Sequence, residues 1–561
     1  QEARIRQLDF YGRNKMNVYI YGPKDDPYHR TPNWRKPYPA REGEELKVLV
    51  NRAKENNVIF YWAIHPGQDI RWNEEDRSLL LQKFESMYQL GVRGFAVFFD
   101  DISGEGTKAD KQAELLNYID DHFVKVKRDV APLILCPTEY NKSWTDVEGG
   151  YLTTLGDKLN EGIKVMWTGD MVVATIDKST LDFVNPLLKR KAYIWWNFPV
   201  SDYVQDHLLL GPVYGNGLDI KDDMSAFVSN PMEHAEASKI SLYSVADYTW
   251  NTDEFDYMKS WETSIEKLVP EIKEEFMRFA SNTCYLKDDG GASGAFEYDE
   301  SWYLNEKIDA LKNAISNNES VIDKANDLLN EFNTIVSDCE IIKENINNDN
   351  LLSEIQPFLN SYNALGEAGV AAMKSLIAAE EGEIEEWLDN NNLASEKLDL
   401  MKTFTVDRLE GENITPYVVA VGEKRLKPIV NEVINVSREI ISKAIFKEIP
   451  PQVISSIKDL NIDVKFENGE YSIGEIKALE LNKDGYIGIA LPKANKLSEV
   501  IIEANDYEGL VLEYSLNGIE WSEAETTVAD GIMKTNNSIA ATFVRLVNKG
   551  DNNKTIDINT F

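Results

Sequence analysis

GFAVFFDD, at residues 94–101, is an apolar run of strand length that ends in two consecutive aspartates, Asp100 and Asp101. A continuous apolar run is typical of a strand buried on both faces, as in a parallel sheet covered by helices. Comparable runs occur at residues 16–21, 58–64, 133–136, 164–167, 192–196 and 239–245. Amphipathic stretches of helical length fill most of the intervals, so the region predicts alternating strands and helices.

Seven such runs within residues 1–260 predict a (β/α)8 TIM-type barrel rather than an open sheet. The first strand of the barrel is not visible, because residues 3–14 have a helical pattern and no strand precedes them. We therefore expect that strand to lie before Gln1, and we expect an open edge with unpaired backbone groups in its absence. In a barrel of this type, functional side chains lie at the C-terminal ends of the strands.

Two further domains follow the predicted catalytic domain of residues 1–260. Residues 261–449 predict an α-helical bundle, because apolar residues recur with a helical period in 320–346, 352–379 and 384–400. Pro450 and Pro451 interrupt this pattern, since a helix does not continue through such a pair. Residues 450–561 then alternate as short strands separated by turn residues, which predicts an antiparallel β-sandwich.

The composition narrows the class of partner and cofactor. The formal net charge of −36 repels phosphate backbones, so nucleic acid is not an expected partner. No apolar run of about 18 residues occurs, so no membrane span is expected. The three cysteines and five histidines form no metal-binding or disulfide pattern, and no glycine-rich phosphate loop occurs. We therefore expect neither a metal nor a cofactor.

The paired aspartates at the end of the 94–99 strand are the principal catalytic candidates. Neighbouring side chains of a strand point to opposite faces, so both carboxylates reach one pocket only if the chain turns there. Two carboxylates held close together favour protonation of one of them, which supplies an acid and a charged partner. The alternative is that an aspartate after a strand simply caps the following helix.

Other polar and aromatic residues lie at or just after the ends of predicted strands, and Asn230 lies in a loop before the predicted strand of residues 239–245. Tyr140 can donate a hydrogen bond to a carbonyl, aromatic faces such as Trp195 stack on sugar rings, and amides and carboxylates bind hydroxyls. Each has a structural alternative, such as a surface tyrosine, a core tryptophan or an Asx-turn. The candidates for binding an uncharged, hydroxyl-rich ligand are Lys24, Tyr140, Trp195, Asn197, Asp202 and Asn230.

Several motifs in this order resemble those of family 84 glycoside hydrolases, the O-GlcNAcase-like β-N-acetylglucosaminidases, and especially the clostridial members. The motifs are YGPKDDPYHR (21–30), FFDDI (98–102), PTEY (137–140), VMWTG (165–169), WWN (195–197) and NPMEHA (230–235). The resemblance implies a retaining, substrate-assisted mechanism in which the 2-acetamido oxygen of the sugar attacks its own anomeric carbon. It covers nearly all of residues 3–260.

The resemblance also implies a role for each candidate. Asp100 would bind the acetamido N–H and stabilise the oxazoline intermediate, and Asp101 would be the general acid and then the base. Tyr140 would orient the acetamido group, Cys136 would touch its methyl group, and Trp195 would wall the pocket. The sugar hydroxyls would be held by Lys24, Asn197, Asp202 and Asn230.

The chain lacks one motif of the family, and its last domain resembles a second family. The family carries a Glu-Gly-Phe-Tyr-Gly motif on its first barrel strand, and this chain has no such segment, in agreement with the missing strand. The last domain resembles discoidin-like, family 32 carbohydrate-binding modules through LEYSLNGIEW (512–521) and FVRLV (543–547).

Three functional hypotheses follow. The first is a secreted or cell-surface exo-β-N-acetylglucosaminidase that acts on GlcNAc-bearing glycans or glycoproteins. The second is a hyaluronidase-like endo-hexosaminidase, which the charge of −36 disfavours because hyaluronan is a polyanion. The third is a non-catalytic glycan-binding protein that uses the sandwich while the incomplete barrel is inert.

Overall fold

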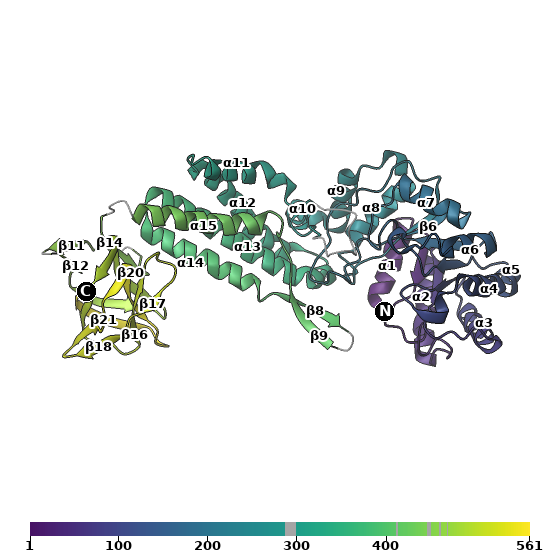
Figure 1. Ribbon diagram of the computed structural model, residues 1–561, viewed down its shortest axis with the longest axis horizontal. Coiled ribbons are helices and arrows are strands. Elements are labelled where there is room, and N and C mark those ends of the chain that lie inside the picture. Colours follow the sequence, from purple (N-terminus) through teal and green to yellow (C-terminus); the bar gives the residue numbers. More distant parts are fainter. Residues whose placement is uncertain (287–298, 411–412, 446–449, 459, 461, 468) are drawn as a thin grey trace. The chain divides into compact units, whose positions relative to one another are not determined.

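The computed structural model describes the chain except for residues 287–298, 411–412, 446–449, 459, 461 and 468. It divides into two compact units (Figure 1). The first comprises Gln1–Glu300, Ile341–Phe358 and Val406–Ala420, and the second comprises Ser301–Glu340, Leu359–Thr405 and Val421–Phe561. The predicted boundary at residue 449 falls among residues 446–449, which lie outside the described residues.

The first unit is built on a seven-stranded sheet. Its strands pair in chain order and every pair is parallel. β3 is buried along its whole length, as its uninterrupted apolar sequence predicts. The strands are β1 (Val18–Tyr21), β2 (Ile59–Ile64), β3 (Gly94–Phe98), β4 (Ile134–Cys136), β5 (Lys164–Trp167), β6 (Ala192–Trp196) and β7 (Met224–Ser229).

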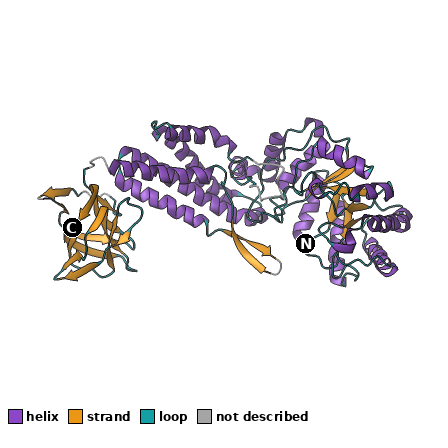
Figure 2. Cartoon of the chain, viewed as in Figure 1, coloured by secondary structure: helices purple, strands orange, loops and turns teal. Residues whose placement is uncertain are grey.

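Helices connect successive strands of this sheet, and Figure 2 shows them surrounding it. Side-chain caps fix two of the helix starts: Asn73 Oδ1 accepts from Asp76 N before α3, and Asp177 Oδ1 accepts from Thr180 N before α7. The helices of the unit are α1 (Glu2–Arg13), α2 (Ala40–Glu55), α3 (Glu74–Gln89), α4 (Ala109–Ile119), α5 (Lys125–Lys127), α6 (Tyr151–Lys158), α7 (Lys178–Leu188), α8 (Lys239–Trp250), α9 (Tyr257–Leu268) and α10 (Lys273–Ser281).

The last strand predicted for the sheet was wrong. Residues 239–245 lie in helix α8, and the seventh strand is the preceding segment β7. α8 is buried on nearly all sides, including Ile240, Leu242 and Val245, so it has no polar face that would reveal a helical period. β7 contains Ser225 and Ser229 and is only partly buried, because it lies at an edge of the sheet.

The sheet is one strand short of a (β/α)8 barrel, as the sequence predicts. β1 and β7 are its two edges, and in the described part of the chain each pairs with one neighbour only, β1 with β2 and β7 with β6. Residues of both edges, including Val18, Ile20 and Val228, line one cavity of about 660 Å³. The sheet therefore curls until its edges face each other across this opening.

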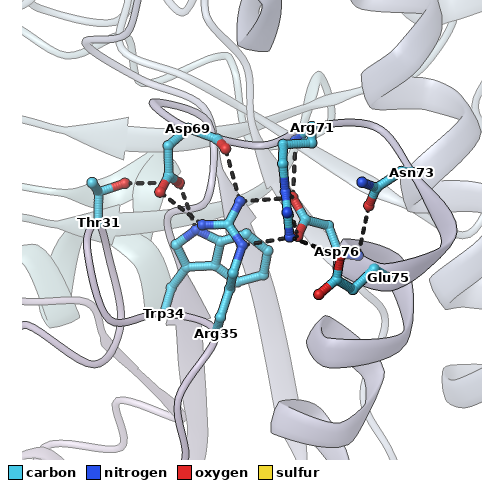
Figure 3. Close-up of polar contacts among 8 residues, drawn as sticks. All are labelled: Thr31, Trp34, Arg35, Asp69, Arg71, Asn73, Glu75 and Asp76. Atoms are coloured by element: carbon cyan, nitrogen blue, oxygen red, sulfur yellow. Dashed lines mark hydrogen bonds and ion pairs between the residues drawn. The ribbon is translucent and has the colours of Figure 1, made fainter.

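A cluster of ion pairs joins the loop after β1 to the loop after β2 (Figure 3). Arg35 binds both Asp69 and the buried Asp76, with N–O distances of 2.7 Å in each case. Arg71 also binds Asp76, at 2.5 Å, and the indole of Trp34 donates to Asp69 at 2.7 Å. The cluster fixes two of the loops that extend from the C-terminal edge of the sheet.

Helices make up most of the middle of the chain, as predicted, with one exception. The exception is an antiparallel hairpin, β8 (Thr405–Glu410) and β9 (Asn413–Val418), where the sequence predicted helix. No helix in the described residues combines the length and the apolar character that crossing a membrane requires. The helices are α11 (Asn305–Ser316), α12 (Ile322–Asn345), α13 (Asp349–Glu381), α14 (Ile384–Met401) and α15 (Leu426–Ile445).

The C-terminal part of the second unit contains two five-stranded antiparallel sheets around an apolar core, which confirms the predicted antiparallel β layout. One sheet has the order β10-β14-β20-β16-β17 and the other β13-β21-β15-β19-β18, while β11 and β12 form a hairpin. The strands are β10 (Gln452–Ser455), β11 (Val464–Glu467), β12 (Glu470–Ile473), β13 (Ile476–Leu481), β14 (Tyr486–Leu497), β15 (Ile501–Ala504), β16 (Leu510–Ser515), β17 (Ser522–Glu523), β18 (Thr526–Ala529), β19 (Ile532–Thr535), β20 (Ile539–Asn548) and β21 (Lys554–Thr560).

Candidate active site

Polar residues gather where the parallel strands of the first unit end. Because neighbouring strands run in the same direction, their C-terminal ends meet at one edge of the sheet. Each of the following residues comes within a few positions of such an end, after β1, β2, β3, β4, β6 and β7 respectively: Lys24, His65, the Asp100–Asp101 pair, Tyr140, Asn197 and Asn230.

The chain turns at the aspartate pair. Asp101 has a φ of 53°, in the left-handed region that side chains other than glycine, asparagine and aspartate rarely adopt. This turn breaks the strand alternation that would send the two carboxylates to opposite faces. The capping alternative is wrong, because Lys108 is the residue at the N-cap of the following helix, α4.

Asp100 is the buried member of the pair, with 6% of its surface exposed. Its Oδ1 atom has no hydrogen-bond partner among the described residues, and His65 Nε2 lies 3.5 Å from it. Burial raises the pKa of Asp100 above its ordinary value, although the nearby His65 and Lys24 act in the opposite direction. Asp100 therefore holds a proton more readily than a carboxylate in water.

Asp101 is the accessible member, with 42% of its side chain exposed. Lys24 Nζ lies 2.6 Å from its Oδ2 atom, and the Tyr140 hydroxyl donates to its Oδ1 atom at 2.9 Å. Burial alone would raise the pKa of Asp101, but the hydrogen bonds and charge of Lys24 and Tyr140 lower it on balance. In the ligand-free site Asp101 is thus the more acidic carboxyl, the reverse of the order that its implied role as general acid suggests.

Trp195, Asn197 and Asn230 form a second hydrogen-bonded group. Asn197 Oδ1 accepts from Trp195 Nε1 at 2.9 Å and from Asn230 Nδ2 at 3.1 Å, and Asn197 Nδ2 donates to the Val172 carbonyl at 2.7 Å. The Trp195 ring lies 5.4 Å from that of Phe98, at the end of β3. Trp195 and Asn230 also line the cavity between the edge strands, so the network gives that cavity a polar and aromatic wall.

The remaining candidates lie in different surroundings. Cys136 is buried in an apolar cluster at the end of β4, and burial raises the pKa of its thiol, which disfavours the thiolate form. Asp202 is exposed in the loop after β6, and its charge helps to raise the pKa of Lys24. Lys24 has 62% of its side chain exposed, which leaves its ammonium free to turn towards a ligand.

Two residues of this region were not singled out by the sequence argument. His65 directly follows β2 and its Nε2 atom lies 2.8 Å from the Asp100 carbonyl oxygen. Trp144 is 51% exposed, and its ring lies 5.0 Å from that of Tyr140. The signal for His65 was present, since it is a polar residue after an apolar strand, as Asp100 is. Trp144 ends a short 3-10 helix, Lys142–Trp144, and does not directly follow a predicted strand, so it had no such signal.

The described residues contain no group of three or more His, Cys, Asp or Glu side chains arranged to hold a metal ion. The two adjacent carboxylates are the groups of this site that can supply acid–base chemistry. Asp100 and Asp101 have pKa values shifted in opposite directions, and Asp101 contacts the phenol of Tyr140 and the ammonium group of Lys24.

Known proteins resemble this chain in sequence and in fold. Residues 1–281 match a family described as beta-N-acetylglucosaminidase, and residues 303–405 match one described as hyaluronidase post-catalytic domain-like. The solved structure of CpGH84B is 33% identical, with a TM-score of 0.70 over 77% of this chain and 74% of that one. CpGH84D is 30% identical, with a TM-score of 0.72 over 78% of this chain and 72% of that one.

A curated relative is the protein O-GlcNAcase of Rattus norvegicus, which is 34% identical over 246 residues. The match covers 42% of this chain and only 26% of the rat protein, so the chain spans about a quarter of that relative's length. The match over residues 1–281, together with the likeness to CpGH84B over 74% of that chain, establishes the family. The chain belongs to the beta-N-acetylglucosaminidase family, family 84 of the glycoside hydrolases.

Proposed function

We propose that the protein is a retaining exo-β-N-acetylglucosaminidase of the O-GlcNAcase type, which removes terminal β-linked GlcNAc from glycans or glycoproteins. The observation that carries the proposal is the turn at Asp101, which gives two adjacent carboxylates with opposite pKa shifts at the C-terminal edge of the sheet. Family membership supports the same reaction.

In the proposed first step, the acetamido oxygen of the sugar forms a bond to the anomeric carbon as the glycosidic bond breaks. Asp100 accepts a hydrogen bond from the acetamido N–H, and its charge stabilises the oxazolinium-like intermediate. Asp101 gives its proton to the leaving oxygen. In the second step Asp101 takes a proton from water, which attacks the same carbon and opens the oxazoline ring with retained configuration.

The proton must reach Asp101 before the first step, although Asp100 holds it more readily in the free site. Lys24 supplies a route. When the Lys24 ammonium group turns from Asp101 to a sugar hydroxyl, Asp101 loses the contact that lowers its pKa. When the acetamido N–H of the sugar binds Asp100, the hydrogen bond favours the charged form of Asp100. Substrate binding then moves one shared proton from the first aspartate to the second.

Tyr140 and Trp195 complete the proposed sugar site. The Tyr140 hydroxyl already lies against Asp101, within reach of an acetamido group that Asp100 binds. The Trp195 indole provides an apolar face for the sugar ring, and Asn230 and Asn197 provide amide groups beside it. Asp202 and Lys24 would bind the outer hydroxyls, and Cys136 would contact the acetamido methyl group.

An endo-acting, hyaluronidase-like activity is the second candidate, because residues 303–405 match a family whose description includes hyaluronidase. The net charge of −36 opposes it, since a polyanionic substrate is repelled. Further proposals are that the C-terminal sandwich is a carbohydrate-binding module and that the protein is secreted or at the cell surface. The first is supported by the antiparallel sheets, and the second by the resemblance to clostridial relatives.

The test is turnover of 4-nitrophenyl β-N-acetylglucosaminide compared with release of reducing ends from hyaluronan. The expected result is hydrolysis of the small glycoside with retained configuration and none of the polymer. Preference for hyaluronan would favour the endo activity. Binding of GlcNAc oligosaccharides with no turnover of either substrate would favour the third hypothesis, a glycan-binding protein with an incomplete barrel.

A further inference from the structure

His65 occupies a fixed position beside the aspartate pair. It directly follows β2, and the register that pairs Ile64 with Val97 of β3 brings it close to the end of β3. Its backbone N–H donates to the His29 carbonyl at 2.7 Å, and only 5% of its surface is exposed. The ring therefore cannot turn away to solvent without breaking the packing of the strand end.

The His65 ring contacts the backbone that joins the two carboxylates. Its Nε2 atom lies 2.8 Å from the carbonyl oxygen of Asp100 and 3.5 Å from Asp100 Oδ1. That carbonyl belongs to the peptide group between Asp100 and Asp101, and Asp101 takes the left-handed conformation immediately after it. A contact to the peptide group that precedes the left-handed residue helps to hold the turn in place.

We propose that His65 is a positioning residue for the catalytic pair, in that its Nε2–H group anchors the Asp100–Asp101 peptide and so sets the direction of both carboxylates. This inference rests on the proposed function, because the importance of the direction comes from the sugar that the carboxylates would contact. No other side chain donates to the Asp100 carbonyl among the hydrogen bonds of the described residues.

Charge supports the same assignment. Interaction with the charge of His65 is among the causes that lower the pKa of Asp100 and of Asp101, which places the ring near both carboxylates. His29 provides a contrast, since it is equally buried and lies 6.2 Å from His65 ring to ring, but its Nδ1 atom lies 3.0 Å from the Ala63 carbonyl. Burial lowers the pKa of His29 to about 4, so it is neutral at physiological pH.

The test compares His65→Phe, His65→Gln and the control His29→Phe in the whole protein. Phenylalanine keeps the ring and removes the N–H, whereas glutamine places an amide N–H near the Nε2 position. We expect His65→Phe to lower kcat by roughly 10- to 100-fold, because displaced reacting groups cost rates of that order. KM should change by less than about threefold, and His65→Gln should regain most of kcat.

The control separates positioning from stability. His29→Phe should lower Tm by about as much as His65→Phe while kcat changes little. Equal loss of kcat in His65→Phe and His65→Gln, or wild-type kcat in His65→Phe, would overturn the proposal.

A crystal structure of His65→Phe provides a readout that needs no turnover: the φ angle of Asp101 should leave the left-handed region or its carboxylate should move. An unchanged turn would refute the anchor even if the wild-type protein is an active glycosidase, and a changed turn would support it even if no substrate is hydrolysed.

Discussion

The Lys24 Nζ atom lies 2.6 Å from Asp101 Oδ2 and so connects the loops that follow two non-adjacent strands, β1 and β3. This contact helps to lower the pKa of the more exposed Asp101, whereas burial raises the pKa of Asp100. The proposed reaction needs the opposite order of the two pKa values once substrate is bound. The ion pair is therefore the point at which ligand binding and proton location are coupled.

Replacing Asp101 by asparagine should remove acid catalysis without removing the binding site. For substrates with poor leaving groups we expect kcat to fall by about 10²–10⁴-fold, the usual contribution of a positioned acid. Substrates with acidic phenol leaving groups need less protonation and should lose less in the first step. The measurement is a leaving-group series of aryl β-N-acetylglucosaminides. Equal losses across the series would contradict the role of Asp101 as the acid.

Removing the ammonium of Lys24 should move the pH profile. Lys24→Met takes away the contact that lowers the pKa of Asp101, so the shared proton of the pair is held to higher pH. Because the proposed acid must carry that proton, the basic limb of kcat/KM should shift to higher pH, and KM should rise. Lys108→Met is the matched control, since Lys108 pairs with Glu105 in an exposed position on the loop that also carries Asp101. A profile that shifts equally in both variants would argue against the coupling.

Asp100→Asn should gain stability as it loses activity. The pKa of Asp100 is raised above its ordinary value of 3.8, which means that the folded protein favours the protonated carboxyl. As pH rises through the pKa of Asp100 in the folded protein, the carboxyl ionises in its buried position and the native state loses stability. The variant should therefore match the wild type near pH 3.8 and exceed it at neutral pH, by about 1–2 kcal/mol. Urea unfolding at several pH values measures this difference. Asp101→Asn should show the opposite sign, because the pKa of Asp101 is lowered and its stabilising effect is lost as pH falls.

Arg35→Met should destabilise the loops of Figure 3. The Asp76 side chain is only 1% exposed and would keep Arg71 but lose its two bonds to Arg35, which predicts a loss of about 3 kcal/mol at neutral pH. Burial alone would raise the pKa of Asp76, but its bonds to Arg35 and Arg71 lower it, so the loss should shrink as pH falls and the carboxylate is protonated. Arg41→Met, which breaks an exposed pair with Glu45, should change stability by less than about 1 kcal/mol.

The parts of the fold that could be predicted from sequence have a clear periodic signal. The run before Asp100 has no polar residue and forms the fully buried β3, and the helical pattern of residues 3–14 forms α1. β7 and α8 were missed because their burial depends on where they lie in the fold. The edge strand β7 contains serines and so lacks a continuous apolar run. The helix α8 is enclosed on nearly all sides and so lacks the polar face that reveals a helical period. The hairpin of β8 and β9 was missed because its two short strands interrupt a long helical region.

The site was predictable to a similar extent. Strand ends located Asp100, Asp101 and Tyr140, because parallel strands bring their C-terminal ends to one edge. Asn230 was predicted from a loop before the expected last strand, whereas it directly follows β7. The order of the two carboxyl pKa values was not predictable, because it depends on a lysine that lies 77 positions away in the chain from Asp101. The contact of His65 with the Asp100 carbonyl likewise depends on the register of β2 against β3.

The most direct measurement is a crystal structure of the protein with a GlcNAc-derived thiazoline, which mimics the oxazoline intermediate. We expect the ligand to lie at the C-terminal edge of the sheet, with its ring nitrogen within hydrogen-bond distance of Asp100 and Asp101 near the anomeric carbon. The Lys24 ammonium should have left Asp101 for a sugar hydroxyl. A thiazoline that binds elsewhere, or binds here with either aspartate directed away from it, would contradict substrate-assisted catalysis by this pair.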